Sequence, residues 1–270
     1  MKQSNYISRW RRVVIKIGSN VLTRDDDHAL DVSRLAEIVD QVARLRQAGI
    51  ETVIVSSGAV SSGRGELRHY PMPELGEVEE RQLCAAVGQT RLMGRYYDFF
   101  REYDMHVGQV LTTKENFADR QHCDNQERCM RAMLQAGVIP IVNENDTVSV
   151  TELMFTDNDE LSGLVAQMVG ADALVILSNI DGLYDGDPAN PESKIIPEVA
   201  PGRNVEEYIQ AKRSSAGRGG MVSKCATAQR LAAEGIDVLI ANGKRPSILL
   251  DLLLPTSGNT VVPHTHFKSK

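Results

Sequence analysis

The sequence predicts an α/β fold in which helices cover both faces of a mostly parallel sheet. Two observations indicate it. Short apolar, β-branched runs alternate with segments of helical periodicity, and polar or glycine-rich turns follow several of these runs. Apolar residues make up 42% of the 270 residues, which is enough to bury a full core. We therefore expect a three-layer αβα sandwich built as a single domain over residues 1–270.

The first half of the chain begins with a buried strand, a β-branched run that ends at a glycine. Asp31 opens a helix with apolar residues at helical spacing, and Gly49 ends it where a left-handed cap favours glycine. The elements expected here are strands over 13–17, 52–55, 106–111 and 138–142, a helix start at 56–59, an exposed loop over 65–76, and helices over 77–103, with an interruption near Gly88 or Gly94, and over 125–135.

The second half begins with a polar, irregular segment over 143–157. The stretch 180–204 is rich in proline and glycine, which is typical of a hairpin excursion. His264 and His266 are expected in a polar, solvated tail. The remaining elements expected here are helices over 158–169 and 222–234, strands over 173–177 and 237–241, and a glycine-rich turn over 217–220.

Composition and absent motifs exclude several classes of protein. The net charge of −6 argues against a broad basic face for nucleic acid, and no stretch is apolar enough to span a membrane. Four cysteines without a C-x-x-C pair are typical of a reduced cytoplasmic enzyme. Neither a P-loop nor a dinucleotide-binding glycine motif is present, and the histidines lack metal-ligand spacing. We expect a cytoplasmic protein with no nucleic-acid or membrane partner.

Three of the polar turns are suited to phosphate. Lys16 lies inside an apolar strand, where an unpaired ammonium is costly, so it is either aimed at an anion or snorkels at the strand end. The turn at Ser57 and Gly58 is either an anion-binding helix start or a simple cap. The glycine-rich stretch 217–221, with Lys224 one turn later, could let backbone approach phosphate or could be a flexible hairpin end.

Two further polar stretches are suited to an amino acid. The run 143–146 follows a strand, and it is either an ordinary turn or a site that binds an amino group through Asp146 and a carboxylate through amides. The run 156–159 opens a helix. It is either a cap or a set of groups, Asn158 and Asp159 among them, that holds a substrate and orients lysines.

Together these stretches resemble the amino acid kinase family. The matches occur in family order from about residue 12 to 262, and the combination is far more specific than any one of them. The matching stretches are 14–19, 57–59, 85–89, 106–109, 143–146, 170–172, 181–184 and 219–221 with Lys224.

The resemblance implies the amino acid kinase fold and a kinase that phosphorylates the γ-carboxylate of L-glutamate with ATP. The product is γ-glutamyl phosphate, in the first step of proline biosynthesis, with Mg²⁺ on the nucleotide phosphates. About 12–170 would hold glutamate and about 171–262 the nucleotide. Proline as an inhibitor, γ-glutamyl phosphate reductase as a partner and a homo-oligomer are further expectations, as is the absence of a C-terminal RNA-modification-type domain.

The resemblance also assigns roles to individual residues. Lys16 and Lys224 would act as catalytic residues on the transferring phosphoryl group, with Asp159 as organiser between them. Ser57, Asp146 and Asn158 would bind glutamate, and no residue is expected to bind a metal. The residues expected to bind the nucleotide are Lys16, Ser178, Asn179, Arg218, Gly219, Gly220, Met221 and Lys224.

Two positions depart from the family pattern. Asn179 stands where the family usually has aspartate, and Arg218 where it often has threonine. Two alternatives stay open from the sequence. One is another amino-acid or acylphosphate kinase of the same fold, and the other is a non-catalytic sensor of glutamate or proline. The combination of Lys16, Asp159 and Lys224 favours a kinase, since binding alone would not require a phosphoryl clamp.

Overall fold

A single central sheet contains strands from both halves of the chain. The structure, a computed structural model, describes residues 8–24, 29–71, 73–149, 158–206, 208, 220–254 and 262–270. Within these residues eight strands pair in the order β3-β4-β2-β1-β5-β7-β8-β6, and all neighbours are parallel except β7 and β8. The strands are β1 (Arg12–Ile17), β2 (Glu51–Ser56), β3 (Val107–Thr112), β4 (Ile139–Glu144), β5 (Ala173–Ser178), β6 (Glu198–Val199), β7 (Asp237–Asn242) and β8 (His264–Phe267).

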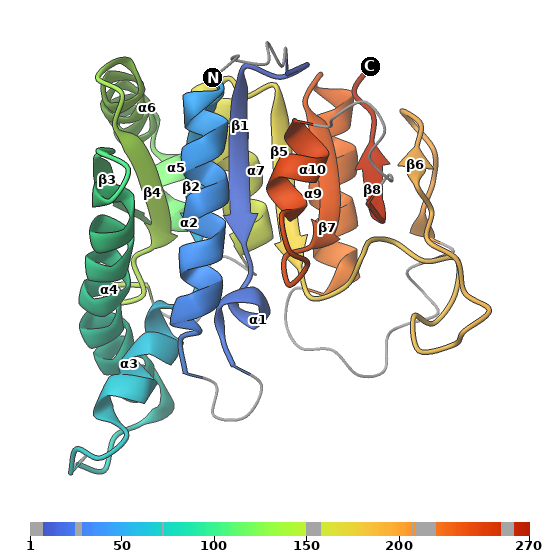
Figure 1. Ribbon diagram of the computed structural model, residues 1–270. Coiled ribbons are helices and arrows are strands. Elements are labelled where there is room, and N and C mark those ends of the chain that lie inside the picture. The colour runs from blue at the N-terminus through green and yellow to red at the C-terminus, as the bar shows by residue number, and fades with distance from the viewer. Residues whose placement is uncertain are drawn as a thin grey trace.

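Helices cover both faces of this sheet, so the expected three-layer α/β architecture is confirmed. Figure 1 shows α2 and α10 in front of the sheet and α7 behind it. No helix of the described residues is both long and apolar enough to cross a membrane. The helices are α1 (Ser19–Leu22), α2 (Val32–Gln47), α3 (Ala59–Leu67), α4 (Glu77–Arg101), α5 (Lys114–Ala118), α6 (Arg120–Gln135), α7 (Asn158–Val169), α9 (Met221–Ala233) and α10 (Ile248–Leu253).

The central strands bury both of their faces, and each face has its own core. In β1, Val13 and Ile15 pack in the core under α2, α4 and α10, whereas Val14 packs in the core with α6, α7 and α9. Successive side chains of a strand point to opposite faces, so a strand buried on both sides reads as a continuous apolar run. That run is the signal from which β1 was predicted.

The predicted interruption of the long helix is wrong, because α4 runs unbroken from Glu77 to Arg101. Gly88 lies against α3, where a β-carbon would come within 1.8 Å of the carbonyl oxygen of Ala59 and 2.4 Å of the amide nitrogen of Gly63. Gly94 has no neighbour within 4 Å of such a carbon. The glycine at 88 therefore permits a close helix–helix contact and does not break the helix.

Two other helices differ from their predicted bounds. The helix expected to begin at residue 125 begins at Arg120, since the Asp119 side chain caps it by accepting the His122 amide at 2.8 Å. The exposed loop expected from residue 65 begins later, because α3 continues to Leu67. Capping geometry of this kind decides helix ends more than apolar periodicity does.

The C-terminal residues do not form a solvated tail, contrary to expectation. His266 lies in β8, pairs opposite Leu239 of β7, and places its Nε2 atom 3.2 Å from Oδ1 of Asp237. The Trp10 indole donates to the other oxygen of Asp237 at 2.8 Å, so segments near both ends of the chain meet at this carboxylate. A strand as short and polar as β8 forms because β7 offers it an edge, and no local pattern predicts that.

Candidate active site

The site predicted from the sequence lies along one edge of the sheet. Strands β1, β2, β4, β5 and β7 are parallel, so their carboxyl ends meet at the same edge, seen as the row of arrowheads in Figure 1. Backbone hydrogen bonds continue the ladder into the turns, from Ser57 to Ile17 at 3.1 Å and from Gly243 to Ser178 at 2.8 Å. Open parallel sheets bind ligands at this edge.

Three of the predicted residues meet in a buried ion-pair cluster. The Lys16 ammonium lies 2.5 Å from Oδ1 of Asp159, and the Lys224 ammonium lies 2.7 Å from Oδ2 of the same carboxylate. The side chain of Asp159 is fully buried, and those of Lys16 and Lys224 are 6% and 11% exposed. Each residue comes from a different element, so only the fold brings them together.

The carboxylate of this cluster is held ionised by its partners. Burial acts to raise the pKa of Asp159, but the adjacent ammonium groups of Lys16 and Lys224 outweigh it and leave that pKa below its ordinary 3.8. A buried charge is tolerated only when it is paired and hydrogen-bonded. The two lysines therefore stay fixed around one carboxylate, in a place where an anionic ligand would meet both.

A second group of predicted residues forms a chain of hydrogen bonds beside the cluster. Asn158, next to Asp159 at the start of α7, donates its amide to the Ser57 hydroxyl at 2.8 Å and to Oδ1 of Asn143 at 3.3 Å. Asn143 in turn donates to Oε1 of Gln89 on α4 at 3.0 Å. The turn after β2, together with α7, β4 and α4, thus presents hydroxyl and amide groups to one region.

Asp146 lies in the turn after β4 and has a cationic partner that the sequence analysis missed. Nη2 of Arg81, in the second turn of α4, donates to Oδ1 of Asp146 at 2.8 Å. Gln82 ties the same helix to the same turn by donating to the Thr147 carbonyl at 2.9 Å. Nothing local predicts the pair, since 65 residues separate its members.

The residues predicted for the nucleotide are only partly described. Ser178 ends β5, where its hydroxyl lies 3.5 Å from Oδ1 of Asn179. Gly220 precedes α9 and Met221 is its first residue, one turn before Lys224. Arg218 and Gly219 lie outside the described residues.

An ion pair that sequence reasoning also missed joins the two turns beside Ser178. Arg245, after β7, donates to both oxygens of Asp181 at 2.6 and 2.7 Å. The hydrogen bond from Arg245 is the largest influence on Asp181 and lowers the pKa of this carboxyl below 3.8. Asp181 belongs to one of the matching stretches, but its arginine partner has no signal in the sequence.

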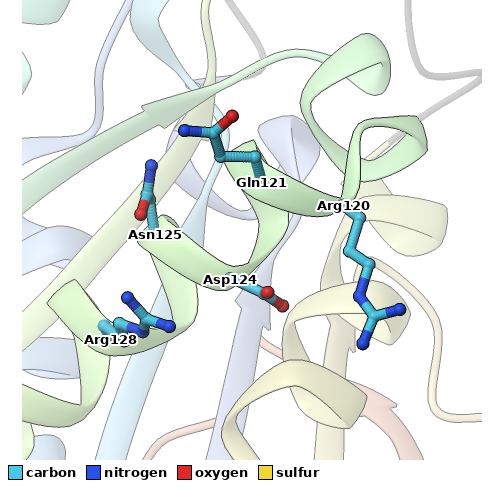
Figure 2. Close-up of a pocket in the computed structure, with 5 residues that line it drawn as sticks. All are labelled: Arg120, Gln121, Asp124, Asn125 and Arg128. Atoms are coloured by element: carbon cyan, nitrogen blue, oxygen red, sulfur yellow. The ribbon is translucent and has the colours of Figure 1, made fainter.

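A surface hollow lies elsewhere, along one stretch of α6. Figure 2 shows the five polar side chains that line it, all from that helix, and none of them was predicted as a site residue. They are Arg120, Gln121, Asp124, Asn125 and Arg128. We therefore place the candidate active site at the strand ends and not in this hollow.

Comparisons with known proteins show the family of this chain. Residues 11–242 match the model of the amino acid kinase family. The chain is 58% identical to a glutamate 5-kinase of Bacteroides thetaiotaomicron over 90% of this chain, and 43% identical to a glutamate 5-kinase of Symbiobacterium thermophilum over 90% of this chain. It spans 66% of the first relative's length and 92% of the second's.

The fold is also similar to that of solved structures with little sequence identity. The UMP kinase of Bacillus anthracis superposes with a TM-score of 0.63 at 15% identity, over 97% of each chain. At that identity the likeness concerns the fold alone. The two chains thus share a similar α/β fold.

Proposed function

We propose, from the fact that this chain belongs to the amino acid kinase family, that it transfers the γ-phosphoryl group of ATP to the γ-carboxylate of L-glutamate, forming γ-glutamyl phosphate. The observation that carries the proposal is the buried cluster of Lys16, Asp159 and Lys224 beside the hydrogen-bonded chain that begins at Ser57. The buried cluster would serve phosphoryl transfer, and the hydrogen-bonded chain would hold the amino acid.

The chemistry requires no general base. An ordinary glutamate side chain has a pKa of about 4.3, so its carboxylate is already a nucleophile at neutral pH. One of its oxygens forms the new bond to phosphorus while the bond to ADP breaks. The protein must then bring two anions together and stabilise charge during transfer, which is electrostatic work.

Lys16 and Lys224 are suited to that work. Their ammonium groups are nearly buried and share Asp159, so their positions are set before any ligand arrives. Preorganised cations in a site with little water stabilise developing charge more strongly than mobile surface cations do. We assign Asp159 the role of holding both lysines, and we assign the lysines the role of contacting the transferring group.

The residues of this edge fit a nucleotide with Mg²⁺. Two buried ammonium groups suit a polyphosphate, and ATP with its Mg²⁺ supplies the phosphoryl group and withdraws charge from its oxygens. The described residues contain no group of three or more His, Cys, Asp or Glu side chains that could hold a metal ion. Mg²⁺ commonly relies on substrate phosphates, and we place it there. The residues after β5 and at the start of α9 would hold the nucleotide.

The amino acid would bind on the β2 and β4 side of the lysines. We assign Ser57 and Asn158 as hydrogen-bonding partners of glutamate and Asp146 as the partner of its α-ammonium group. On this assignment residues from about 12 to 170 hold glutamate, and residues from about 171 to 262 hold the nucleotide. Both parts share one sheet through the pairing of β1 with β5.

The proposal also covers the oligomeric state of the protein, its location, the enzyme that uses its product and its inhibitor. We expect a homo-oligomer in the cytoplasm, where the four free cysteines would stay reduced. The acyl phosphate is a reactive product, so a γ-glutamyl phosphate reductase is the natural consumer. Proline, which resembles the head group of glutamate, is proposed as an inhibitor.

One assay tests the function. The purified chain is incubated with ATP, with and without Mg²⁺, and with each candidate amino acid. ADP release is measured in a coupled assay, and hydroxylamine traps any acyl phosphate as a hydroxamate. We expect glutamate-dependent ADP release and hydroxamate. Release with a different acid would indicate another kinase of this fold, and glutamate binding without ADP release would indicate a sensor.

A further inference from the structure

We propose that Arg81 is a further substrate-binding residue, whose guanidinium binds the α-carboxylate of the amino acid while the neighbouring Asp146 binds its α-ammonium group. The inference rests on the proposed function and deepens it, because it adds a specificity determinant to the amino-acid site. Nη2 of Arg81 lies 2.8 Å from Oδ1 of Asp146. Together the two side chains form a receptor with one charge of each sign.

The two members of the pair differ in exposure. The Asp146 side chain is 9% exposed and the Arg81 side chain is 40% exposed. The carboxylate is therefore the inner member, and part of the Arg81 side chain is open to solvent.

The guanidinium also has hydrogen-bonding capacity that the protein does not use. Nε of Arg81 is buried and donates to no acceptor in the described parts of the chain. A buried donor without an acceptor is unfavourable, and an arginine presents its donors as a fork that matches a carboxylate. A carboxylate is an acceptor-only group, so it is the kind of partner that the donors of this guanidinium require.

The arrangement of charges fits the head group of an amino acid. The α-ammonium and α-carboxylate of a free amino acid are attached to one carbon, so their receptor needs opposite charges side by side. A direct contact between Asp146 and Arg81 provides that spacing. Asp146, the predicted partner of the α-ammonium group, thus lies directly beside a cation. A guanidinium binds a carboxylate better than an ammonium group would, because its planar fork of donors matches the two carboxylate oxygens.

The surroundings connect this pair to the rest of the amino-acid site. Asn143, three residues before Asp146, contacts both Gln89 of α4 and Asn158 of α7. Helix α4 therefore contributes Arg81 and Gln82 to the turn after β4, and it contributes Gln89 to the end of that strand. The same geometry allows a plain structural reading, in which Arg81 only clamps α4 to the turn. Gln82, which holds the same turn through Thr147, provides a matched control for that reading.

The experiment compares L-glutamate with L-isoglutamine, in which the α-carboxylate is a neutral amide and the γ-carboxylate is retained. The values of kcat/KM are measured for the native chain, Arg81→Gln, Arg81→Lys and Gln82→Ala. We expect the native chain to prefer glutamate. Arg81→Gln should lower kcat/KM for glutamate about 10- to 100-fold, which is typical for loss of a charged hydrogen bond, and should leave isoglutamine and the KM for ATP nearly unchanged. Arg81→Lys should restore part of the preference, and Gln82→Ala should keep it.

Several results would overturn the inference. These are a native chain that does not distinguish the two compounds, an Arg81→Gln variant that loses activity equally on both, or a Gln82→Ala variant that loses the preference as well. If no variant turns over either compound, the proposed function fails. The same comparison is then made by calorimetric titration of glutamate and isoglutamine, where a preference that depends on Arg81 supports the inference and its absence rejects it.

Discussion

The Lys16 ammonium, near the end of β1, lies 2.5 Å from Oδ1 of the fully buried Asp159 in the first turn of α7. Neither charge would be stable at this depth without the other, because an unpaired buried charge costs several kcal/mol. The presence of a lysine within an apolar strand is thereby explained. The pair fixes one cation at the strand ends, and Lys224 adds a second at the other oxygen of the carboxylate.

The first prediction concerns Lys224. We expect Lys224→Ala to lower kcat by about 10²–10³, the loss typical of one contact to charge that develops in the transition state, with little change in the KM for glutamate. Lys16→Ala should behave similarly. Steady-state kinetics measure both constants, and Lys268→Ala, at a half-exposed lysine that pairs with Glu198, is the control. A variant with near-native kcat and a raised KM for glutamate would contradict the assigned role.

The second prediction concerns the amino-acid site. Asp146→Ala and Asn158→Ala should each raise the KM for glutamate and leave the KM for ATP nearly unchanged. Aspartate is one methylene shorter, so its carboxylate would stop short of the phosphoryl group, and a misplacement of that size can cost ~10² in rate. Turnover of both acids is compared under identical conditions. Equal reaction of aspartate and glutamate would rule out the assigned pocket.

The third prediction is competition by proline. Proline carries an α-carboxylate and a secondary ammonium but no side-chain carboxylate, so it could bind where Asp146 lies and accept no phosphoryl group. Initial rates are measured against proline at low and at saturating glutamate. We expect the inhibition midpoint to rise with glutamate. A midpoint that does not depend on glutamate, or no inhibition at millimolar proline, would show that the two sites do not overlap.

The fourth prediction separates two glycines of one helix. A β-carbon at Gly88 would collide with the backbone of α3, so Gly88→Ala should destabilise the fold by about 1–3 kcal/mol or more. Gly94 is exposed and its surroundings are open, so Gly94→Ala should stabilise the helix by about 0.5–1 kcal/mol. Urea unfolding measures both free energies. Equal effects of the two substitutions would show that α3 and α4 are not in close contact at Gly88.

The fifth prediction follows from His266. Burial lowers the pKa of its imidazole below 6.5 despite the adjacent Asp237, so the folded chain binds the proton less readily than the unfolded chain. The free energy of unfolding should therefore fall as the pH drops through 6.5, and the fall should be smaller in His266→Gln. Fluorescence of Trp10, the single tryptophan, reports unfolding in urea at pH 7.5, 6 and 5.

The control for this prediction is His122→Gln, since that imidazole is 62% exposed. The carboxyl of Asp237 does not contribute to the pH dependence between pH 7.5 and 5, because its pKa lies below that range. Burial acts to raise its pKa, but hydrogen bonds from the Ser269 amide and Trp10, together with the adjacent His266 imidazole, keep it below 3.8. An unchanged pH dependence in His266→Gln would mean that this imidazole does not titrate differently on folding.

The sequence by itself determined the layers of the fold and the identity of several candidate site residues. Continuous apolar runs such as β1 identify strands buried on both faces, because every side chain of such a strand must avoid water. Lys16 was singled out for the same reason, since a charge inside such a run needs a partner. These inferences require only the properties of neighbouring residues.

Tertiary structure alone decided the partners. Arg81 meets Asp146, and Arg245 meets Asp181, across 65 and 64 residues respectively, and β8 forms only because β7 presents an edge to it. Local periodicity indicates which side chains avoid water. It does not indicate which distant charges meet, because that pairing depends on strand order and on how helices pack, and both are settled only when the chain folds.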